Sequence, residues 1–200
     1  MHDCIFTAHC TEHVCDRSCP ILAETSYLLE RNGIDLNSKV FDLSAKEIFQ
    51  FQTILDKSID SVGVMLSDNT VVDAEKLTFV AICNNWEHSQ LHCTVYNLKF
   101  SKYLEEIKKS WNTHVESETL EYMRIWLDAA KVLIISNFDY VNFGDFESQM
   151  MLTLLQDRQA RGKTTIFVSP PLDMLVSSKA SIFFNNLKLK FTRAVKVVSE

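Results

Sequence analysis

The sequence predicts an α/β domain in which helices cover both faces of a parallel β-sheet. From residue 62 onward, short apolar runs rich in β-branched residues alternate with longer amphipathic stretches. This alternation is typical of buried parallel strands joined by helices. Of the 200 residues, 46% are apolar and 23% are charged, which suits a sizeable core and excludes wholesale disorder. The length fits one ordinary domain with a small appendage.

Two helices are expected before this domain. Pro20 suits the first turn of a helix, and Asn32 and Gly33 end its apolar pattern. Ser44 and Glu47 have the spacing of a capping box, which predicts that a second helix begins there.

Within the domain, each expected strand is a short apolar run and each expected helix is an amphipathic stretch. The expected strands are Val62 to Leu66, His92 to Tyr96, Val132 to Ile135, Thr165 to Val168 and Ala194 to Val198. The expected helices are Asp73 to Asn85, Phe100 to Trp111, Ser117 to Ala130, Asp145 to Arg161, and Leu172 to about Phe184. By their spacing, Trp111 and the other tryptophans are expected mostly in the core.

Four cysteines fall within sixteen residues near the N-terminus: Cys4, Cys10, Cys15 and Cys19. Such a short segment cannot bury enough apolar surface to fold alone, and a bound metal ion would supply the missing free energy. Zinc is the expected ion, with a four-iron cluster as the alternative and four unliganded thiols as the ordinary interpretation. We therefore divide the chain into a Cys-rich, helical, metal-binding region, residues 1–58, and the α/β domain, residues 59–200. Cys83 and Cys93 are expected to be small buried hydrophobes.

The charge is unevenly spread along the chain. Residues 156–200 carry eight basic and three acidic side chains, a net +5, which leaves −11 for residues 1–155. Such a tail could contact nucleic acid or an acidic partner, or could be an ordinary solvated face. The candidate contact residues are Arg158, Arg161, Lys163, Lys188, Lys190 and Arg193. Phe183 and Phe184 either add an exposed contact or pack the last helix.

A further pattern carries a family resemblance. Residues 131–169 form an apolar strand ending in polar residues, then a helix, then a second strand, and residues 62–66 and 79–84 look like the flanks of a phosphate loop. Over residues 60–198 the chain thus resembles the ATPase domain of bacterial helicase loaders of the DnaC and DnaI kind and of their IstB-like relatives. The resemblance implies a three-layer parallel sheet of the AAA+, P-loop-like type.

The family's phosphate loop is missing from this chain. The pattern Gly-x-x-Gly-x-Gly-Lys-Thr/Ser belongs between residues 66 and 79, where this sequence has no glycine. The family's lysine aligns with Glu75, or is displaced to Lys76. Asp68, Asp73 and Glu75 would place negative charge where a triphosphate sits. At an effective dielectric constant of about 20, one like-charge contact at about 4 Å costs on the order of 4 kcal/mol.

The family's other catalytic groups are also replaced. The two acidic residues that hold magnesium and activate water align with Ser136 and Asn137, which can do neither. The polar sensor aligns with Ser169 and Pro170, and the helix expected to carry the arginine finger, residues 181–190, has no arginine.

The sequence therefore indicates a pseudo-ATPase that binds no nucleotide. The resemblance implies a non-catalytic accessory protein of DNA replication, acting as adaptor, loader-like factor or inhibitor on a replicative helicase, a loader or an associated replication protein. Two alternatives stay open: a metal-containing DNA-binding protein that uses its basic C-terminal segment, and a divergent ATPase in which Asp139 replaces the missing acids. Small size and divergence suit a phage or a mobile element. With neither a signal-peptide pattern nor a membrane-length apolar run, we expect a cytoplasmic protein with no membrane partner.

Overall fold

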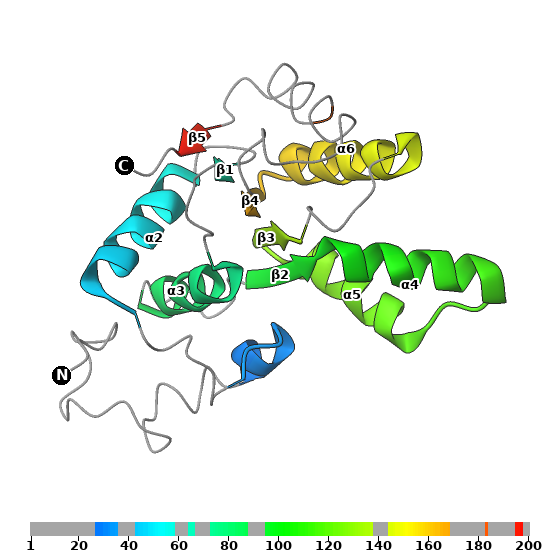
Figure 1. Ribbon diagram of the computed structural model, residues 1–200, viewed down its shortest axis with the longest axis horizontal. Coiled ribbons are helices and arrows are strands. Elements are labelled where there is room, and N and C mark those ends of the chain that lie inside the picture. The colour runs from blue at the N-terminus through cyan, green and yellow to red at the C-terminus, as the bar shows by residue number, and fades with distance from the viewer. Residues whose placement is uncertain are drawn as a thin grey trace.

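Five parallel strands form one sheet in the order β2-β3-β4-β1-β5 (Figure 1). The computed structural model describes residues 27–35, 43–58, 64–66, 73–87, 95–137, 144–168, 183 and 195–197. The strands are β1 (Val64–Leu66), β2 (Val95–Lys99), β3 (Val132–Ser136), β4 (Thr164–Val168) and β5 (Val195–Val197). All five lie within two or three residues of their predicted positions, and the parallel pairing confirms the predicted sheet.

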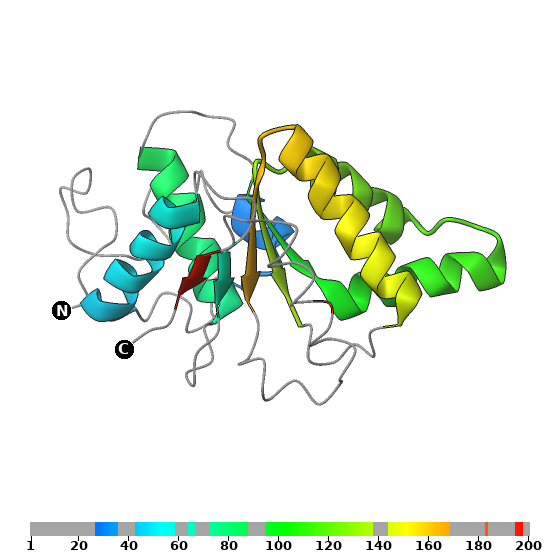
Figure 2. The same ribbon diagram turned by 90° about the horizontal axis from the view of Figure 1, so that it is seen from above.

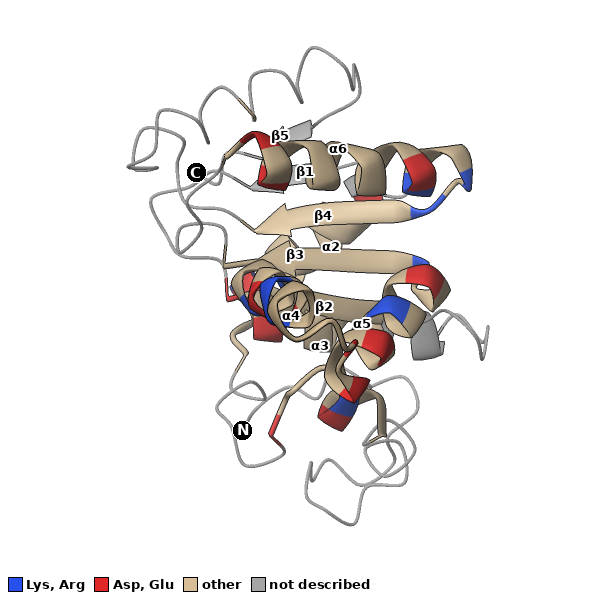
Figure 3. Ribbon diagram, turned by 90° about the vertical axis from the view of Figure 1, so that its right-hand side faces the viewer, with Lys and Arg blue, Asp and Glu red and all other residues tan. Residues whose placement is uncertain are grey.

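Helices cover both faces of this sheet. On one face lie α2 (Ala45–Ser58) and α3 (Ala74–Glu87), and on the other lie α4 (Phe100–Thr113), α5 (Glu118–Ala129) and α6 (Asp145–Ala160) (Figure 2). Charged residues are distributed along α4, α5 and α6, whereas β3 and β4 contain none (Figure 3). The predicted three-layer α/β arrangement is therefore confirmed.

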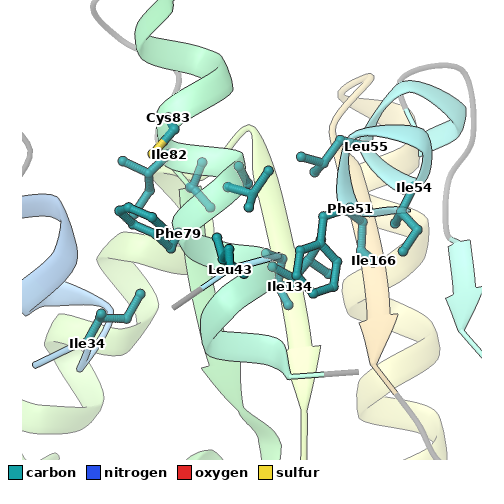
Figure 4. Close-up of a cluster of buried hydrophobic side chains, with 14 of the residues drawn as sticks. Ile34, Leu43, Phe51, Ile54, Leu55, Phe79, Ile82, Cys83, Ile134 and Ile166 are labelled. Atoms are coloured by element: carbon teal, nitrogen blue, oxygen red, sulfur yellow. The ribbon is translucent and has the colours of Figure 1, made fainter. Parts of the chain in front are cut away.

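Successive residues along the central strands pack on opposite faces of the sheet, because side chains of a strand alternate. Ile134 and Ile166 join the cluster beneath α2 and α3, which includes Phe51 and Phe79 (Figure 4). Leu133, Ile135 and Phe167 join the cluster beneath α4, α5 and α6. Both faces are therefore buried, as the near-continuous apolar runs of the sequence require.

Part of the N-terminal region belongs to this same core. Leu29, Ile34 and Phe51 are buried in one cluster with residues of α3 and the sheet. The hydrophobic core therefore continues across the boundary that we placed between residues 58 and 59. Cys83 is buried in the same cluster, as predicted, and Cys93 lies outside the described residues.

The predicted end of the first helix and the predicted start of the second are confirmed, whereas Pro20 lies outside the described residues. The backbone N–H of Ser44 donates to Glu47 Oε2 at 2.8 Å, and the N–H of Glu47 donates to Ser44 Oγ at 3.2 Å, which is a complete capping box. Helical residues 27–31 end at Gly33, whose φ of +68° lies in the left-handed region that glycine favours. The N–H of Ile34 returns to Leu29 O at 2.9 Å and closes this turn.

The edge strand β2 begins three residues later than predicted and contains the polar residue Asn97. The contacts of Asn32 account for a polar residue at this position. Asn32 is buried, and its side chain meets β2 as a neighbouring strand would. Its Nδ2 donates to Val95 O at 3.2 Å, and its Oδ1 accepts from Asn97 N at 2.6 Å. Because one carboxamide satisfies two outward-facing backbone groups, the sheet edge is closed to further pairing there.

Three other expectations concern Trp111, Phe183 and the last predicted helix. Trp111 is 53% exposed, so its predicted place in the core is wrong. Phe183 is buried, which confirms packing rather than an exposed contact for that residue. The rest of the helix predicted over residues 172–184 lies outside the described residues. Among the helices in the described ranges, none is long and apolar enough to cross a bilayer.

Candidate functional site

Ligand sites of open parallel sheets lie beyond the carboxyl ends of the strands. Here α3 begins after the carboxyl end of β1, and Ser136 is the last residue of β3, with β4 lying between the two strands. Glu75, Lys76, Ser136 and Asn137, which the resemblance assigns to nucleotide chemistry, therefore lie along one edge of the sheet. Residues 67–72, which join β1 to α3, lie outside the described residues.

The N-terminus of α3 is capped by the chain's own carboxylate. Asp73 Oδ1 accepts from the backbone N–H of Glu75 at 2.8 Å and from that of Lys76 at 3.1 Å. In phosphate-binding loops, the free N–H groups at a helix N-terminus face the phosphate. In this protein two of those donors already hold an anion that is part of the fold.

Lys76 connects α3 to α2. Its Nζ lies 2.9 Å from Glu47 Oε1, and its side chain is only 19% exposed. Glu47 also accepts the capping-box bonds, and the backbone N–H of Ser44, the Lys76 ammonium and the Ser44 hydroxyl lower its pKa to about 2. The lysine nearest to the phosphate-binding position therefore holds two helices together.

Glu75, the residue aligned with the family's lysine, makes an ion pair of its own. Its Oε1 lies 3.1 Å from Lys99 Nζ at the end of β2. Both side chains are more than a third exposed, so this pair adds little stability. The pair instead changes the local charge. Glu75 neutralises Lys99 at the edge of the sheet where a triphosphate would need cations.

Ser136 and Asn137 lack the acidic chemistry of the family's second motif. Ser136 is buried, and its Oγ donates to Asn97 Oδ1 at 3.1 Å. The backbone N–H of Asn97 in turn donates to Asn32 Oδ1, so Ser136 belongs to a hydrogen-bond network that holds β2 in place. Asn137 has a φ of 62°, a left-handed conformation that asparagine tolerates well. Neither side chain supplies an anionic magnesium ligand or a general base.

Arg158 is not a nucleic-acid contact, so this part of the predicted contact set is wrong. It is 1% exposed, because α6 packs it between the end of α5 and the start of β4. All its N–H donors are used within the protein. Nε donates to Thr165 Oγ1 at 2.8 Å, Nη1 to Leu127 O at 3.1 Å and Ala130 O at 3.0 Å, and Nη2 to Lys131 O at 3.3 Å and Thr164 O at 2.7 Å.

Arg161 and Lys163 lie at the surface and are engaged by Asp128. Arg161 pairs with the carboxylate of Asp128 and, at 3.2 Å, with Asp157. Lys163 donates to the backbone carbonyl of Asp128. The remaining predicted contacts, Lys188, Lys190 and Arg193, lie outside the described residues, so contact with nucleic acid stays a prediction for them.

The predicted metal ligands also lie outside the described residues. Nothing in the structure tests Cys4, Cys10, Cys15 and Cys19, so a zinc or iron–sulfur site there stays a prediction. Within the ranges that the structure does describe, no group of three His, Cys, Asp or Glu side chains is placed to hold a metal ion.

The residues that fill this edge were only partly recognisable in the sequence. Asp73 directly precedes the apolar pattern of α3, which is the local signal of an N-cap. Glu47 was recognised as part of a capping box, but its pairing with Lys76 joins residues 29 apart. Lys99 and Asn32 carried no local signal for the contacts that they make.

The fold is similar to that of a known replication protein. The sequence matches no protein-family model and no curated protein. Domain III of the replication initiation protein DnaA from Thermotoga maritima superposes with a TM-score of 0.55 at 11% identity, over 83% of this chain and 69% of that one. A protein described as a primosome component from Streptococcus pyogenes serotype M3 gives a TM-score of 0.45 at 16% identity, over 83% and 82% of the two chains. The first likeness shows a shared α/β fold, and the second is too distant to carry an argument.

Proposed function

We propose that this protein is a non-catalytic, AAA+-like accessory factor of DNA replication that uses its fold to bind other proteins. It would act as an adaptor, loader-like factor or inhibitor on a replicative helicase or an associated replication protein. The observation that carries the proposal is the occupied N-terminus of α3, where Asp73 takes the N–H groups that a phosphate would need. The similarity to domain III of DnaA supports the fold alone.

The estimated free energies oppose nucleotide binding at this edge of the sheet. A nucleotide would displace Asp73, an N-cap worth about 1 kcal/mol. A carboxylate left about 4 Å from a phosphate would oppose binding by on the order of 4 kcal/mol. Because each 1.4 kcal/mol changes an equilibrium tenfold, the two effects weaken binding by roughly a thousandfold or more.

The two other candidates receive less support. A DNA-binding role would use the basic residues of the C-terminal segment. Of these, Arg158 is buried and Arg161 already pairs with two aspartates. A divergent ATPase would need a carboxylate near Ser136, and Asp139, the nearest one in the sequence, lies outside the described residues.

Purified replicative helicase from the source organism tests the proposed partner. Sedimentation velocity of the full chain mixed with this helicase should show a complex with the same affinity whether or not ATP is added to the small protein beforehand. Loading or unwinding by the helicase should change when the complex forms. Absence of a complex with helicase, loader and primase alike would contradict the replication role.

The N-terminal cysteines give the proposal a metal component. We expect about one zinc ion per chain, held by Cys4, Cys10, Cys15 and Cys19 as thiolates. Elemental analysis of anaerobically purified protein measures this directly, and iron with visible absorption would favour the cluster instead. Cys10→Ser should lower the metal content and expose the first thirty residues to protease. Unchanged metal content and protease resistance would contradict the site.

A further inference from the structure

An exposed aromatic surface lies where α5 meets the helical residues 27–31. Tyr27 is 59% exposed, Tyr122 is 44% exposed and Ile125 is 54% exposed. Trp126 lies half-buried among them. We call these four residues the α5 face. Tyr122 and Ile125 are three residues apart on one helix, so their side chains are neighbours.

The α5 face already holds one cation. The guanidinium of Arg31 lies 3.6 Å from the centre of the Trp126 ring and 5.8 Å from that of Tyr27. Tyr122 meets Trp126 edge-to-face, with the ring centres 5.8 Å apart. Aromatic rings attract guanidinium and ammonium groups through their negative faces. The face therefore has the chemistry to accept another basic side chain over Tyr122.

Acidic residues border the α5 face. Glu118 and Glu121 lie on α5 four residues before Tyr122 and Ile125, and Glu30 lies beside Tyr27 on the N-terminal helical segment. All three are exposed, and none forms an ion pair within the described part of the chain. Most other carboxylates around α4, α5 and α6 are paired, those of Glu106, Glu116, Asp128 and Glu147 among them.

We propose that the α5 face docks a basic segment of a partner protein. An arginine of that segment would stack on Tyr122 and bond Glu118 or Glu121, while an apolar side chain beside it would pack on Ile125. Charge complementarity selects this occupant, because the unpaired carboxylates attract cations and repel the phosphates of a nucleic acid. The inference goes beyond the proposed function, since it holds whichever replication protein, if any, is the partner and whether or not nucleotide binds.

A labelled peptide tests this surface on the full chain. The probe is a fluorescein-labelled amphipathic peptide of arginines and leucines at helical spacing, followed by fluorescence anisotropy. We expect saturable binding that weakens as salt rises. Tyr122→Ala, and separately Glu118→Gln with Glu121→Gln, should each weaken binding roughly tenfold. The same peptide with glutamates in place of arginines should not bind.

Phe49→Ala provides the matched control, because Phe49 is 70% exposed on α2, at the far side of the sheet from α5 (Figure 1). This variant should bind the peptide as the wild type does. Urea unfolding should show unchanged stability for the Tyr122 and glutamate variants. The proposal is overturned if the arginine peptide does not bind, if the variants bind it like the wild type, or if a labelled single-stranded oligonucleotide without the peptide binds the protein and Tyr122→Ala weakens that binding.

Discussion

Arg158 keeps a positive charge inside the domain with no carboxylate in contact. Burial lowers its pKa to about 10, partly opposed by the nearby Asp157 and Asp128, so the guanidinium stays charged at neutral pH. Four backbone carbonyls and the Thr165 hydroxyl replace its water shell. Since three of those carbonyls belong to the end of α5 and to the two residues after it, Arg158 fixes that helix end against β4.

Truncating this side chain should destabilise the domain strongly. Arg158→Ala removes the Arg158 donors from the buried carbonyls of Leu127 and Ala130, and each such group left unsatisfied costs roughly 1–3 kcal/mol. We expect a loss of at least about 3 kcal/mol in the free energy of unfolding measured with urea. Arg158→Lys should fall between alanine and the wild type, because an ammonium keeps the charge and loses the planar fork.

Arg161→Ala is the control for that variant, because its pairs are exposed and should cost less than about 1 kcal/mol. Equal costs for the two alanine variants would contradict the structural role of Arg158. The sequence could not reveal this role. Arginine is mostly exposed in proteins, and only the folded chain brings the carbonyls around residues 127–131 and 164 to one point.

Helices α2 and α3 are tied by the pair between Glu47 and Lys76. The pKa of Glu47 falls from 4.5 to about 2 in the folded protein. A carboxylate with a depressed folded pKa stabilises the native state above its unfolded pKa, and this contribution is lost as the pH falls toward the folded value. The contribution of Glu47 is therefore complete at neutral pH and disappears between about pH 4.5 and about pH 2.

Glu47→Gln should lower the free energy of unfolding by up to about 1 kcal/mol at pH 7, because the amide keeps the capping-box acceptor and loses the ion pair with Lys76. The difference from the wild type should shrink as the pH falls through the acid range, which urea unfolding at a series of pH values would measure. Glu105→Gln, on the exposed side of α4, should show no such convergence. A constant difference at every pH would show that the charge of Glu47 has no part in the link.

The edge strand β2 depends on Asn32. Asn32→Ala leaves Asn97 N without its acceptor and Val95 O with Arg31 as its remaining donor, so we expect a loss of about 1–3 kcal/mol. Asn32→Asp should be at least as damaging, because a carboxylate cannot donate to Val95 O and is buried beside it. Amide hydrogen exchange at Asn97 should accelerate in both variants. Unchanged protection of that amide would contradict the role of Asn32.

At the scale of single helices and strands, most elements could be predicted because their sequence signals are local. The capping box at Ser44, the turn at Gly33 and the apolar period of α3 depend on neighbouring residues only. The end of β2 could not be predicted in the same way. Asn97 and Lys99 look unlike strand residues, and their partners Asn32 and Glu75 lie far from them in the sequence.

Across the whole molecule, a parallel α/β fold is combined with a carboxylate cap at the N-terminus of α3. The absence of a glycine-rich loop and of paired acids could be predicted, because both depend on residue types at fixed spacing. What replaces them could not, because the pairs Lys76–Glu47 and Lys99–Glu75 join residues 29 and 24 positions apart. The residue types at these positions can thus be read from the sequence, whereas the contacts around the N-terminus of α3 depend on the fold.

Equilibrium titration of the full chain with a fluorescent ATP analogue and magnesium tests the central claim most directly. Because Asp73 holds the α3 amides and Glu47 and Glu75 hold the nearby lysines, we predict no saturable binding even at millimolar nucleotide. Saturable binding that unlabelled ATP competes away, with a dissociation constant in the micromolar range, would contradict the account.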